Sequence, residues 1–247
     1  MRKGLWRVWL GLGLAALSGV LFYVHYLIFH DLHHLGIYTM HDIAFLPLEV
    51  LIVTLLLHTM LEWREHQELL QKLNMVIGAF FSEVGGELIE RLSAFDTRPD
   101  VLHERYEVTT DWTDEQLKRA SADAIQRSFD LKPTRDGTTD LRDFMIAKRQ
   151  FLLRLLENQN LLENERFTEV LWAVFHLGDE LQRRTDMAAS PDSDMAHLAG
   201  DMERAYGRLV AEWFEHLRHL KVRYPYLYAL AVRANPMTLE GQIEVLG

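Results

Sequence analysis

The chain has 247 residues, of which 49% are apolar, 25% are charged and none is cysteine. This length accommodates a membrane segment plus one soluble domain, and the composition is that of a folded chain rather than a disordered one. The net charge of −10 argues against a nucleic-acid partner, because phosphate binding requires clustered Lys and Arg. The absence of cysteine excludes disulfides and thiolate chemistry.

Residues 1–29 begin with basic side chains and continue as an apolar run that ends at Phe29. A signal peptide begins in a similar way, but this run is longer than a signal core and no A-x-A cleavage site follows it. We therefore predict a first transmembrane helix of about 22–25 residues. Small residues at every fourth position predict a smooth face for close helix packing, although such residues are also common in membrane helices. They are Gly11, Ala15 and Gly19.

A second apolar run, residues 41–61, is the stretch around which the chain is organised. Together the two runs predict a transmembrane hairpin over residues 1–61, with a short loop at 30–42. By the positive-inside rule, both termini are expected in the cytoplasm and the loop outside, which predicts a multi-pass protein of the cell membrane in contact with lipid. The loop contains no Lys or Arg, whereas the outer ends of the two runs are flanked by Arg2, Lys3, Arg7, Arg64 and Lys72.

The second run carries an acidic residue, Glu49, within its apolar sequence. A carboxylate inside a membrane costs at least ~2.5 kcal/mol unless it meets water, protein or a partner charge. Asp42 lies seven residues earlier, and therefore two turns away on the same helix face. In a homo-oligomer this face would form acidic rings at the mouth of a cation pore, since two helices cannot enclose a pore alone. The predicted ion path comprises Asp42, Glu49, Thr54 and His58.

The predicted external loop has the most unusual composition in the chain, because imidazole and carboxylate side chains crowd into residues 30–42. These groups are the usual ligands of Zn²⁺, Ni²⁺, Cu²⁺ and Fe²⁺, so the loop is a candidate site for a divalent metal ion. The alternative is a polar interfacial loop whose His side chains cap helix ends and face lipid headgroups. The candidate ligands are His30, Asp31, His33, His34 and His41.

Residues 62–95 predict a stalk, because no helix-stop signal separates them from the second apolar run. Gly85 and Gly86 are the expected place for this helix to bend or stop, since glycine lacks the helix preference of its neighbours. Apolar residues at intervals of three and four predict one buried stripe, close to a coiled-coil seam. The stripe comprises Leu70, Leu73, Ile77, Phe80, Val84, Leu88 and Leu92.

Residues 96–247 predict a cytoplasmic α-helical domain, because they contain no alternating strand pattern of useful length. Thr113 and Gln116 have the spacing of a capping box. We expect a bundle of four or five helices. Its predicted parts are a connection at 93–112, a loop at 130–139, helices at 140–158, 164–185 and 190–223, a shorter helix between Pro225 and Pro236, and a loose or docked tail at 239–247.

Acidic and His residues recur at helical spacing in this domain and form three groups. Carboxylate-bridged di-iron bundles use Glu-x-x-His pairs, and this chain contains no such pair among the three groups. Basic residues follow at nearby positions, so a solvated face with ordinary ion pairs is the favoured interpretation. The groups are Asp194 with His197 and Asp201, Glu212 with His216 and His219, and His176 with Glu180.

No nucleophile elbow, phosphate-binding glycine loop or H-E-x-x-H motif occurs, and we do not expect an enzyme. The sequence predicts an all-α protein in which a two-span hairpin extends into a cytoplasmic bundle. Its function is predicted to be that of an oligomeric cation channel or transporter. The alternative is a membrane-anchored sensor or scaffold whose acidic domain binds a cytoplasmic protein. In that case Glu49 is hydrated near the interface, or is protonated and hydrogen-bonded near His25 or Tyr26.

Overall fold

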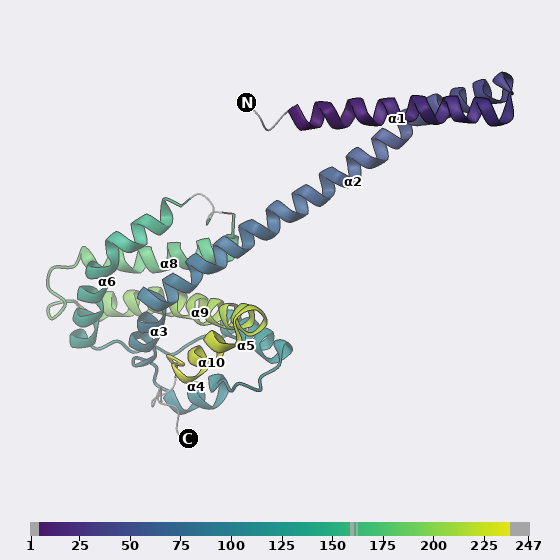
Figure 1. Ribbon diagram of the computed structural model, residues 1–247. Coiled ribbons are helices and arrows are strands. Elements are labelled where there is room, and N and C mark those ends of the chain that lie inside the picture. The colour runs from purple at the N-terminus through teal and green to yellow at the C-terminus, as the bar shows by residue number, and fades with distance from the viewer. Residues whose placement is uncertain (1–4, 159–160, 162, 238–247) are drawn as a thin grey trace. The chain divides into compact units, whose positions relative to one another are not determined.

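The structure, a computed structural model, describes residues 5–158, 161 and 163–237. The described residues contain helices and no strands, which confirms the predicted all-α class. The chain divides into two compact units, Met1–His66 and Gln67–Gly247. The helices (Figure 1) are α1 Leu5–Phe29, α2 Leu32–Phe80, the π-helical turn η1 Phe81–Gly85, α3 Gly86–Ser93, α4 Pro99–Tyr106, α5 Asp114–Gln126, α6 Arg135–Leu156, α8 Glu165–Gln182, α9 Asp192–Arg223 and α10 Pro225–Arg233.

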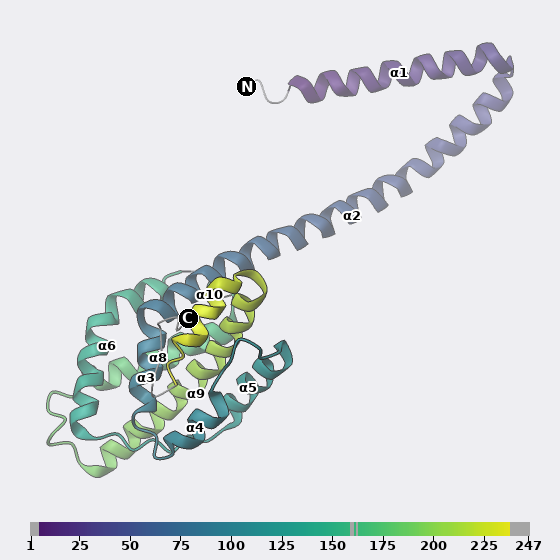
Figure 2. The same ribbon diagram turned by 60° about the horizontal axis from the view of Figure 1, so that its bottom comes forward.

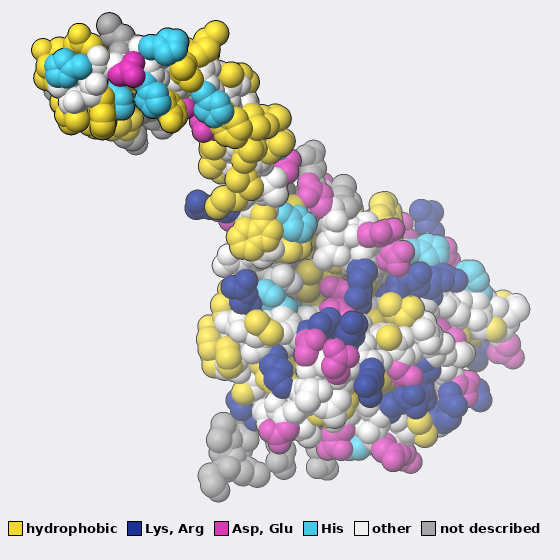
Figure 3. Space-filling view, turned by 90° about the vertical axis from the view of Figure 1, so that its right-hand side faces the viewer, with side chains coloured by type: hydrophobic (Ala, Val, Ile, Leu, Met, Phe, Trp, Pro, Cys, Tyr) yellow, Lys and Arg dark blue, Asp and Glu magenta, His cyan; other side chains and the backbone are white. Residues whose placement is uncertain are grey.

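The N-terminal unit consists of α1 and the first part of α2. Both helices are long and apolar enough to cross a membrane, judged by length and composition alone, and no part of their most apolar windows is buried. Space-filling shows apolar side chains over this unit, with His side chains gathered at one end (Figure 3). The unit therefore presents its apolar residues outward instead of enclosing them in a core.

The connection between α1 and α2 is shorter than predicted. We expected a loop over 30–42, but α2 begins at Leu32 and only His30 and Asp31 lie outside the helices. His30 adopts a φ of 50°, a left-handed conformation that reverses the chain within one residue. The backbone N–H of His34 donates to Asp31 Oδ1 at 3.0 Å, so Asp31 caps the new helix at once. Most of the His-rich segment is consequently helical.

Helix α2 continues from the second apolar run into the predicted stalk without interruption, as the missing stop signal predicted, and it also contains Pro47. Six of the seven stripe residues are buried at 3% exposure or less, and Leu70 is half-buried. The glycine pair marks the predicted interruption, which takes the form of the π-helical turn η1 followed by α3. A Cβ on Gly85 would lie 2.6 Å from Phe81 Cδ1 and 2.7 Å from Phe80 Cε1. The turn therefore requires glycine at this position because two aromatic rings occupy the space of a side chain.

The C-terminal unit is organised around α9, which packs against α5, α8, α10 and α3 (Figure 2). All residues from 209 to 214 of α9 are buried, as expected for a helix surrounded by others. Small residues allow the close approach: a Cβ on Gly207 would lie 3.1 Å from the carbonyl oxygen of Ala124 in α5. Aromatic pairs fill the core, including Phe80 with Phe167 at 5.3 Å between ring centroids.

Two segments of this unit differ from the sequence prediction. The supposed connection at 93–112 contains α4, which begins at Pro99, because proline is well suited to the first turn of a helix. The supposed loop at 130–139 ends early, since Thr134 accepts a hydrogen bond from the Gly137 N–H and starts α6 at Arg135. The capping box of Thr113 and Gln116 is confirmed. The predicted tail at 239–247 lies outside the described residues.

Candidate ligand pocket on helix α9

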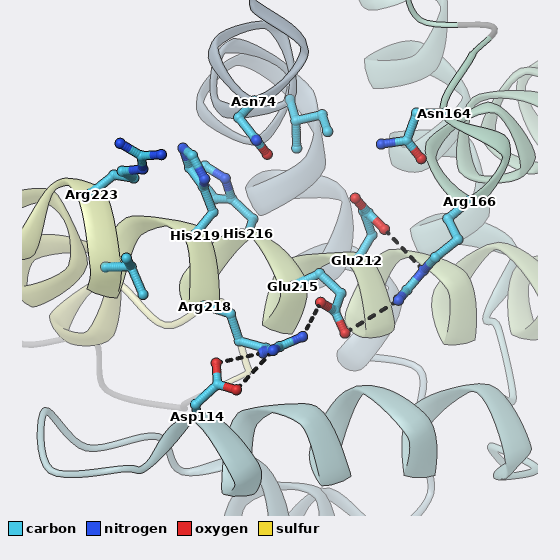
Figure 4. A pocket seen from close by; sticks show the side chains of 12 residues that line it. Asn74, Asp114, Asn164, Arg166, Glu212, Glu215, His216, Arg218, His219 and Arg223 are labelled. Atoms are coloured by element: carbon cyan, nitrogen blue, oxygen red, sulfur yellow. Dashed lines mark hydrogen bonds and ion pairs between the residues drawn. The ribbon is translucent and has the colours of Figure 1, made fainter. Parts of the chain in front are cut away.

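A pocket of about 390 Å³ opens along α9 in the C-terminal unit (Figure 4). Polar and charged side chains from four elements dominate its lining. Glu212 and His216 enter it from α9, Asn74 from α2 and Arg166 from α8 (Figure 4). The other lining residues are Ile77, Asp114, Asn164, Glu215, Arg218, His219, Val222 and Arg223.

Helix α9 brings its ionisable residues to the pocket by simple periodicity. Glu212, Glu215, His216 and His219 lie at positions i, i+3, i+4 and i+7, which share one face of a helix. Glu212 and His216 are nevertheless only 6% and 7% exposed, because the neighbouring helices cover the flanks of this face. The pocket thus combines an opening with two buried titratable side chains.

Two arginines connect the acids of the pocket into a chain of ion pairs (Figure 4). Arg166 Nη1 lies 3.2 Å from Glu215 Oε1, and Arg218 Nη1 donates to Glu215 Oε2 at 2.7 Å. Arg218 also donates two hydrogen bonds of 2.8 Å to the carboxylate of Asp114. Glu212 is less well compensated, since its Oε2 lies 3.7 Å from Arg166 Nε, beyond hydrogen-bond distance. Glu215 is therefore paired on both oxygens, whereas Glu212 has one distant cation.

Burial shifts the protonation equilibrium of Glu212 towards the neutral form. It raises the pKa of this carboxyl group to about 7, the negative charge of Glu215 adds to the shift, and Arg166 opposes it. The physical cause is the loss of water around the charged form, which the single distant guanidinium does not replace. Glu212 therefore exchanges its proton near neutral pH, in a pocket that solvent can reach.

Burial shifts the pKa of His216 in the opposite direction. Burial lowers the pKa of its imidazole to about 4, and His219 contributes a smaller repulsion. The ring stacks on Phe81 at 5.3 Å between centroids, and its Nδ1 is buried without a hydrogen-bond partner among the described residues. An unpaired buried nitrogen is costly, so His216 carries one unsatisfied polar atom within the wall of the pocket.

The structure places the residues predicted from the sequence as an ion path in the N-terminal unit. Asp42, Glu49, Thr54 and His58 all lie on α2 and are exposed. Neither Asp42 nor Glu49 forms an ion pair with a described residue, whereas His58 Nε2 lies 3.0 Å from Glu62 Oε1. Within one chain, these side chains therefore do not line a pore.

The residues predicted to bind a metal or to pack helices are also exposed. Among the described residues, the one group of three His or carboxylate side chains with ligand atoms within 4.8 Å of one another lies in the C-terminal unit. The predicted ligands His30, Asp31, His33, His34 and His41 do not form such a group. A Cβ on Gly11 or Gly19 would have no atom within 4 Å, and Ala15 is exposed.

The interpretation of the charged groups as a solvated face is wrong for three of their members. Asp201, Glu212 and His216 are buried. The sequence contained one usable signal, which is the pair of small residues Gly207 and Ala211 within the helix predicted at 190–223. Such residues indicate close helix packing on a second side, and a helix covered on two sides buries the polar residues between them.

Comparison with known proteins places the chain in a family. Two family models match, "MJ1433, N-terminal helical domain" at residues 2–61 and "Uncharacterized protein MJ1433, C-terminal helical domain" at residues 69–233. The chain is 39% identical to the uncharacterized protein MJ1433 of Methanocaldococcus jannaschii over 220 residues, which are 89% of this chain and 88% of that protein. This chain belongs to the MJ1433 family. No solved structure matches it.

The two MJ1433 family models divide the chain where the structure divides it. The first model ends at residue 61 and the second begins at 69, on either side of the boundary between His66 and Gln67. The α9 pocket lies wholly within the C-terminal helical domain of the MJ1433 family, because its lining residues run from Asn74 to Arg223.

Proposed function

We propose that this protein is a membrane-anchored sensor. The hairpin of α1 and α2 inserts into the cell membrane, and the C-terminal unit is a cytoplasmic domain that responds to protonation and to a small polar ligand in the α9 pocket. The single observation that carries the proposal is that Glu212 lines the pocket at 6% exposure with its nearest guanidinium 3.7 Å away, so that burial raises the pKa of its carboxyl group to about 7. Perturbed titratable groups in a pocket are typical of functional sites.

The exposed apolar surface of α1 and α2 supports the anchor. Along residues 9–61 nearly every large apolar side chain is exposed, for example Leu55 at 56% and Leu57 at 55%. Soluble proteins rarely expose contiguous apolar surface of this extent, and a lipid bilayer removes it from water. The distribution of Lys and Arg then favours cytoplasmic termini.

The chemistry of the pocket supports the sensor. When Glu212 loses its proton, a negative charge arises in the pocket, with the Arg166 guanidinium 3.7 Å away. A ligand that donates a hydrogen bond to the carboxylate stabilises this charged form, so its binding releases a proton. The pocket therefore couples ligand binding to pH within the range of the cytoplasm.

Infrared spectroscopy of the full chain in lipid nanodiscs tests the titration. A protonated buried carboxyl group has a C=O band separate from carboxylate bands, and in the wild type this band should disappear with a midpoint near pH 7. Glu212→Gln should abolish the titration, and Glu90→Gln, at an exposed position, should retain it. A wild type without a titrating band between pH 6 and 8 would overturn the sensor proposal.

Single-cysteine labelling tests the anchor, since the chain has no cysteine of its own. Gly36→Cys has open space around the new side chain, and Ser82→Cys occupies an exposed position of the C-terminal unit. In intact cells an impermeant maleimide should label Gly36→Cys and spare Ser82→Cys, and permeabilised cells should label both. The reverse pattern in intact cells would contradict the proposed orientation.

A second candidate function is an oligomeric cation channel, favoured by Asp42 and Glu49 of α2, neither of which forms an ion pair with another described residue. Glu49 is exposed in the middle of an apolar helix, so within a bilayer it requires water or a second copy of the chain. In proteoliposomes, Glu49→Gln should strongly reduce cation flux and Glu49→Asp should retain part of it. Asp42→Asn should weaken ion capture mainly at low ionic strength, where screening is least. A wild type without flux would leave the anchored sensor as the function.

A further inference from the structure

A second group of ionisable side chains lies between α8 and α9, nearer the N-terminus of α9 than the pocket. His176 and Glu180 of α8 are four residues apart, as are His197 and Asp201 of α9. Residues four apart lie above one another on one helix face. Because α8 packs against α9, the two helices bring two imidazoles and two carboxylates together.

Asp201 is the centre of this group. Its side chain is 3% exposed, and its Oδ2 lies 3.6 Å from His176 Nε2 and 3.4 Å from His197 Nε2. These separations are longer than ordinary hydrogen bonds, and no described residue donates a hydrogen bond to this buried oxygen. A buried carboxylate oxygen without a donor is a costly arrangement unless a cation satisfies it.

The same separations fit two ligands of one metal ion. Ligand atoms about 2.1 Å from a tetrahedral Zn²⁺ lie about 3.4 Å from each other. The ligand atoms of Glu180, His197 and Asp201 all lie within 4.8 Å of one another. His176 lies outside this group of three and approaches it through Asp201 Oδ2, which is 3.6 Å from its Nε2. We propose that His176, Glu180, His197 and Asp201 bind one divalent transition-metal ion, for which Zn²⁺ has suitable ligand chemistry.

Two arginines orient the carboxylates of this proposed site. Arg204 Nη1 donates to Asp201 Oδ1 at 2.6 Å, which leaves Oδ2 directed at the two imidazoles. Arg184 Nη1 donates to Glu180 Oε2 at 2.8 Å and leaves the other oxygen available. Hydrogen bonds of this kind to the second oxygen of a ligand fix its direction in known metal sites.

The alternative to a metal site is a pair of weak ion pairs between protonated His side chains and Asp201. Both imidazoles are about half exposed, at 51% and 59% of the side chain, so an ion from solvent can reach them. A bound metal ion would link α8 to α9 and stabilise the C-terminal unit. The two interpretations therefore differ in metal stoichiometry and in thermal stability.

The experiment uses the full chain in detergent, stripped by a chelator and then titrated with Zn²⁺ alone. Calorimetry should give one ion per chain for this site, and the thermal transition of the C-terminal unit should rise with Zn²⁺. Co²⁺ should give the visible absorption of a tetrahedral site. His176→Gln and His197→Gln, at exposed positions, should fold and should each weaken binding at least about tenfold.

A matched control separates this site from the His-rich segment of the N-terminal unit. A variant with His30, His33, His34 and His41 all changed to Gln should retain the ion and the thermal shift. Loss of the ion in that control, or unchanged Zn²⁺ affinity in both His176→Gln and His197→Gln, would overturn the proposal. A wild type that binds no Zn²⁺ and shows no thermal shift would overturn it as well.

Discussion

Glu49 and Glu212 show how differently the two units treat an acid within an apolar helix. Glu49 is exposed on α2, whose apolar side chains face outward along residues 33–61. Glu212 is 6% exposed on α9, where the core of the C-terminal unit surrounds it and raises its pKa to about 7. The chain itself therefore fixes the environment of Glu212, whereas lipid, water or another copy must provide the environment of Glu49.

The same contrast holds for apolar side chains in the two units. A leucine or phenylalanine in the C-terminal unit contributes to stability through contacts within the chain. A leucine of α1 or α2 outside that unit has few such contacts and contributes through the medium around it. Variants that report on unfolding of the C-terminal unit should therefore separate the two units clearly.

The largest expected effect is that of a core truncation. Phe214 is fully buried, with ring centroids 5.4 Å from Tyr106 and 6.0 Å from Trp112. Phe214→Ala should lower the free energy of unfolding of the C-terminal unit by about 3–5 kcal/mol, because it removes apolar contacts and leaves a cavity. Leu55→Ala should leave it unchanged. Denaturant titration in detergent measures both, and equal effects would contradict the division into units.

The next largest effect is a change in how the free energy of unfolding depends on pH when Glu212 is replaced. Its pKa is higher in the folded state than its ordinary value of 4.5, so the wild type loses stability as pH rises from about 4.5 through 7. A shift to about 7 corresponds to about 3 kcal/mol. Glu212→Gln lacks this loss and should gain up to about 3 kcal/mol relative to the wild type between pH 4 and 8. A constant difference across this range would argue against a buried, titrating Glu212.

His216 should change the pH dependence with the opposite sign. Its pKa in the folded state is about 4, below its ordinary value of 6.5, so the wild type loses stability as pH falls from 6.5 towards 4. His216→Gln should therefore gain stability relative to the wild type in acid, by up to about 3 kcal/mol. The two contributions oppose each other between about pH 4.5 and 6.5. When unfolding is measured at several pH values, the free energy of unfolding of the wild type should vary less with pH than that of either variant.

The smallest expected effect on stability is that of a glycine substitution, compared between the two units. Gly85→Ala would place its Cβ 2.6 Å from the Phe81 ring, and overpacking of this kind costs about 1–3 kcal/mol. Gly19→Ala meets open space and should leave the unfolding of the C-terminal unit unchanged. If Gly19 packs against a second copy, this variant should instead weaken self-association in detergent. A stabilised Gly85→Ala variant would contradict the tight η1 turn.

Local sequence signals were sufficient for most of the helices. The stripe from Leu70 to Leu92, the capping box at Thr113 and the extent of α9 follow from periodicity and capping, which depend on residues within a few positions. Local signals failed to predict where two helices begin, because each starts at a capping residue inside a segment predicted to be a loop. Asp31 caps α2 immediately after the turn, and Thr134 caps α6 within a stretch that has the composition of a loop.

The candidate site was less accessible to sequence reasoning than the fold. The group of Glu212, His216 and His219 was apparent from helical spacing, but its burial was not. The partners Asn74, Arg166 and Asp114 come from helices far away in the sequence. No local pattern predicts which arginine approaches which acid, because that choice depends on how the helices pack.

The sequence by itself determined the helical class, the two apolar runs and the position of the interruption near Gly85. These properties depend on hydrophobic periodicity and on backbone preference, which neighbouring residues specify. Only the tertiary structure decided that Asp201, Glu212 and His216 are buried. The protonation of Glu212 and His216 follows from that burial. The physical reason is that desolvation depends on how many sides of α9 are covered, and helices α3, α5, α8 and α10 together provide that cover.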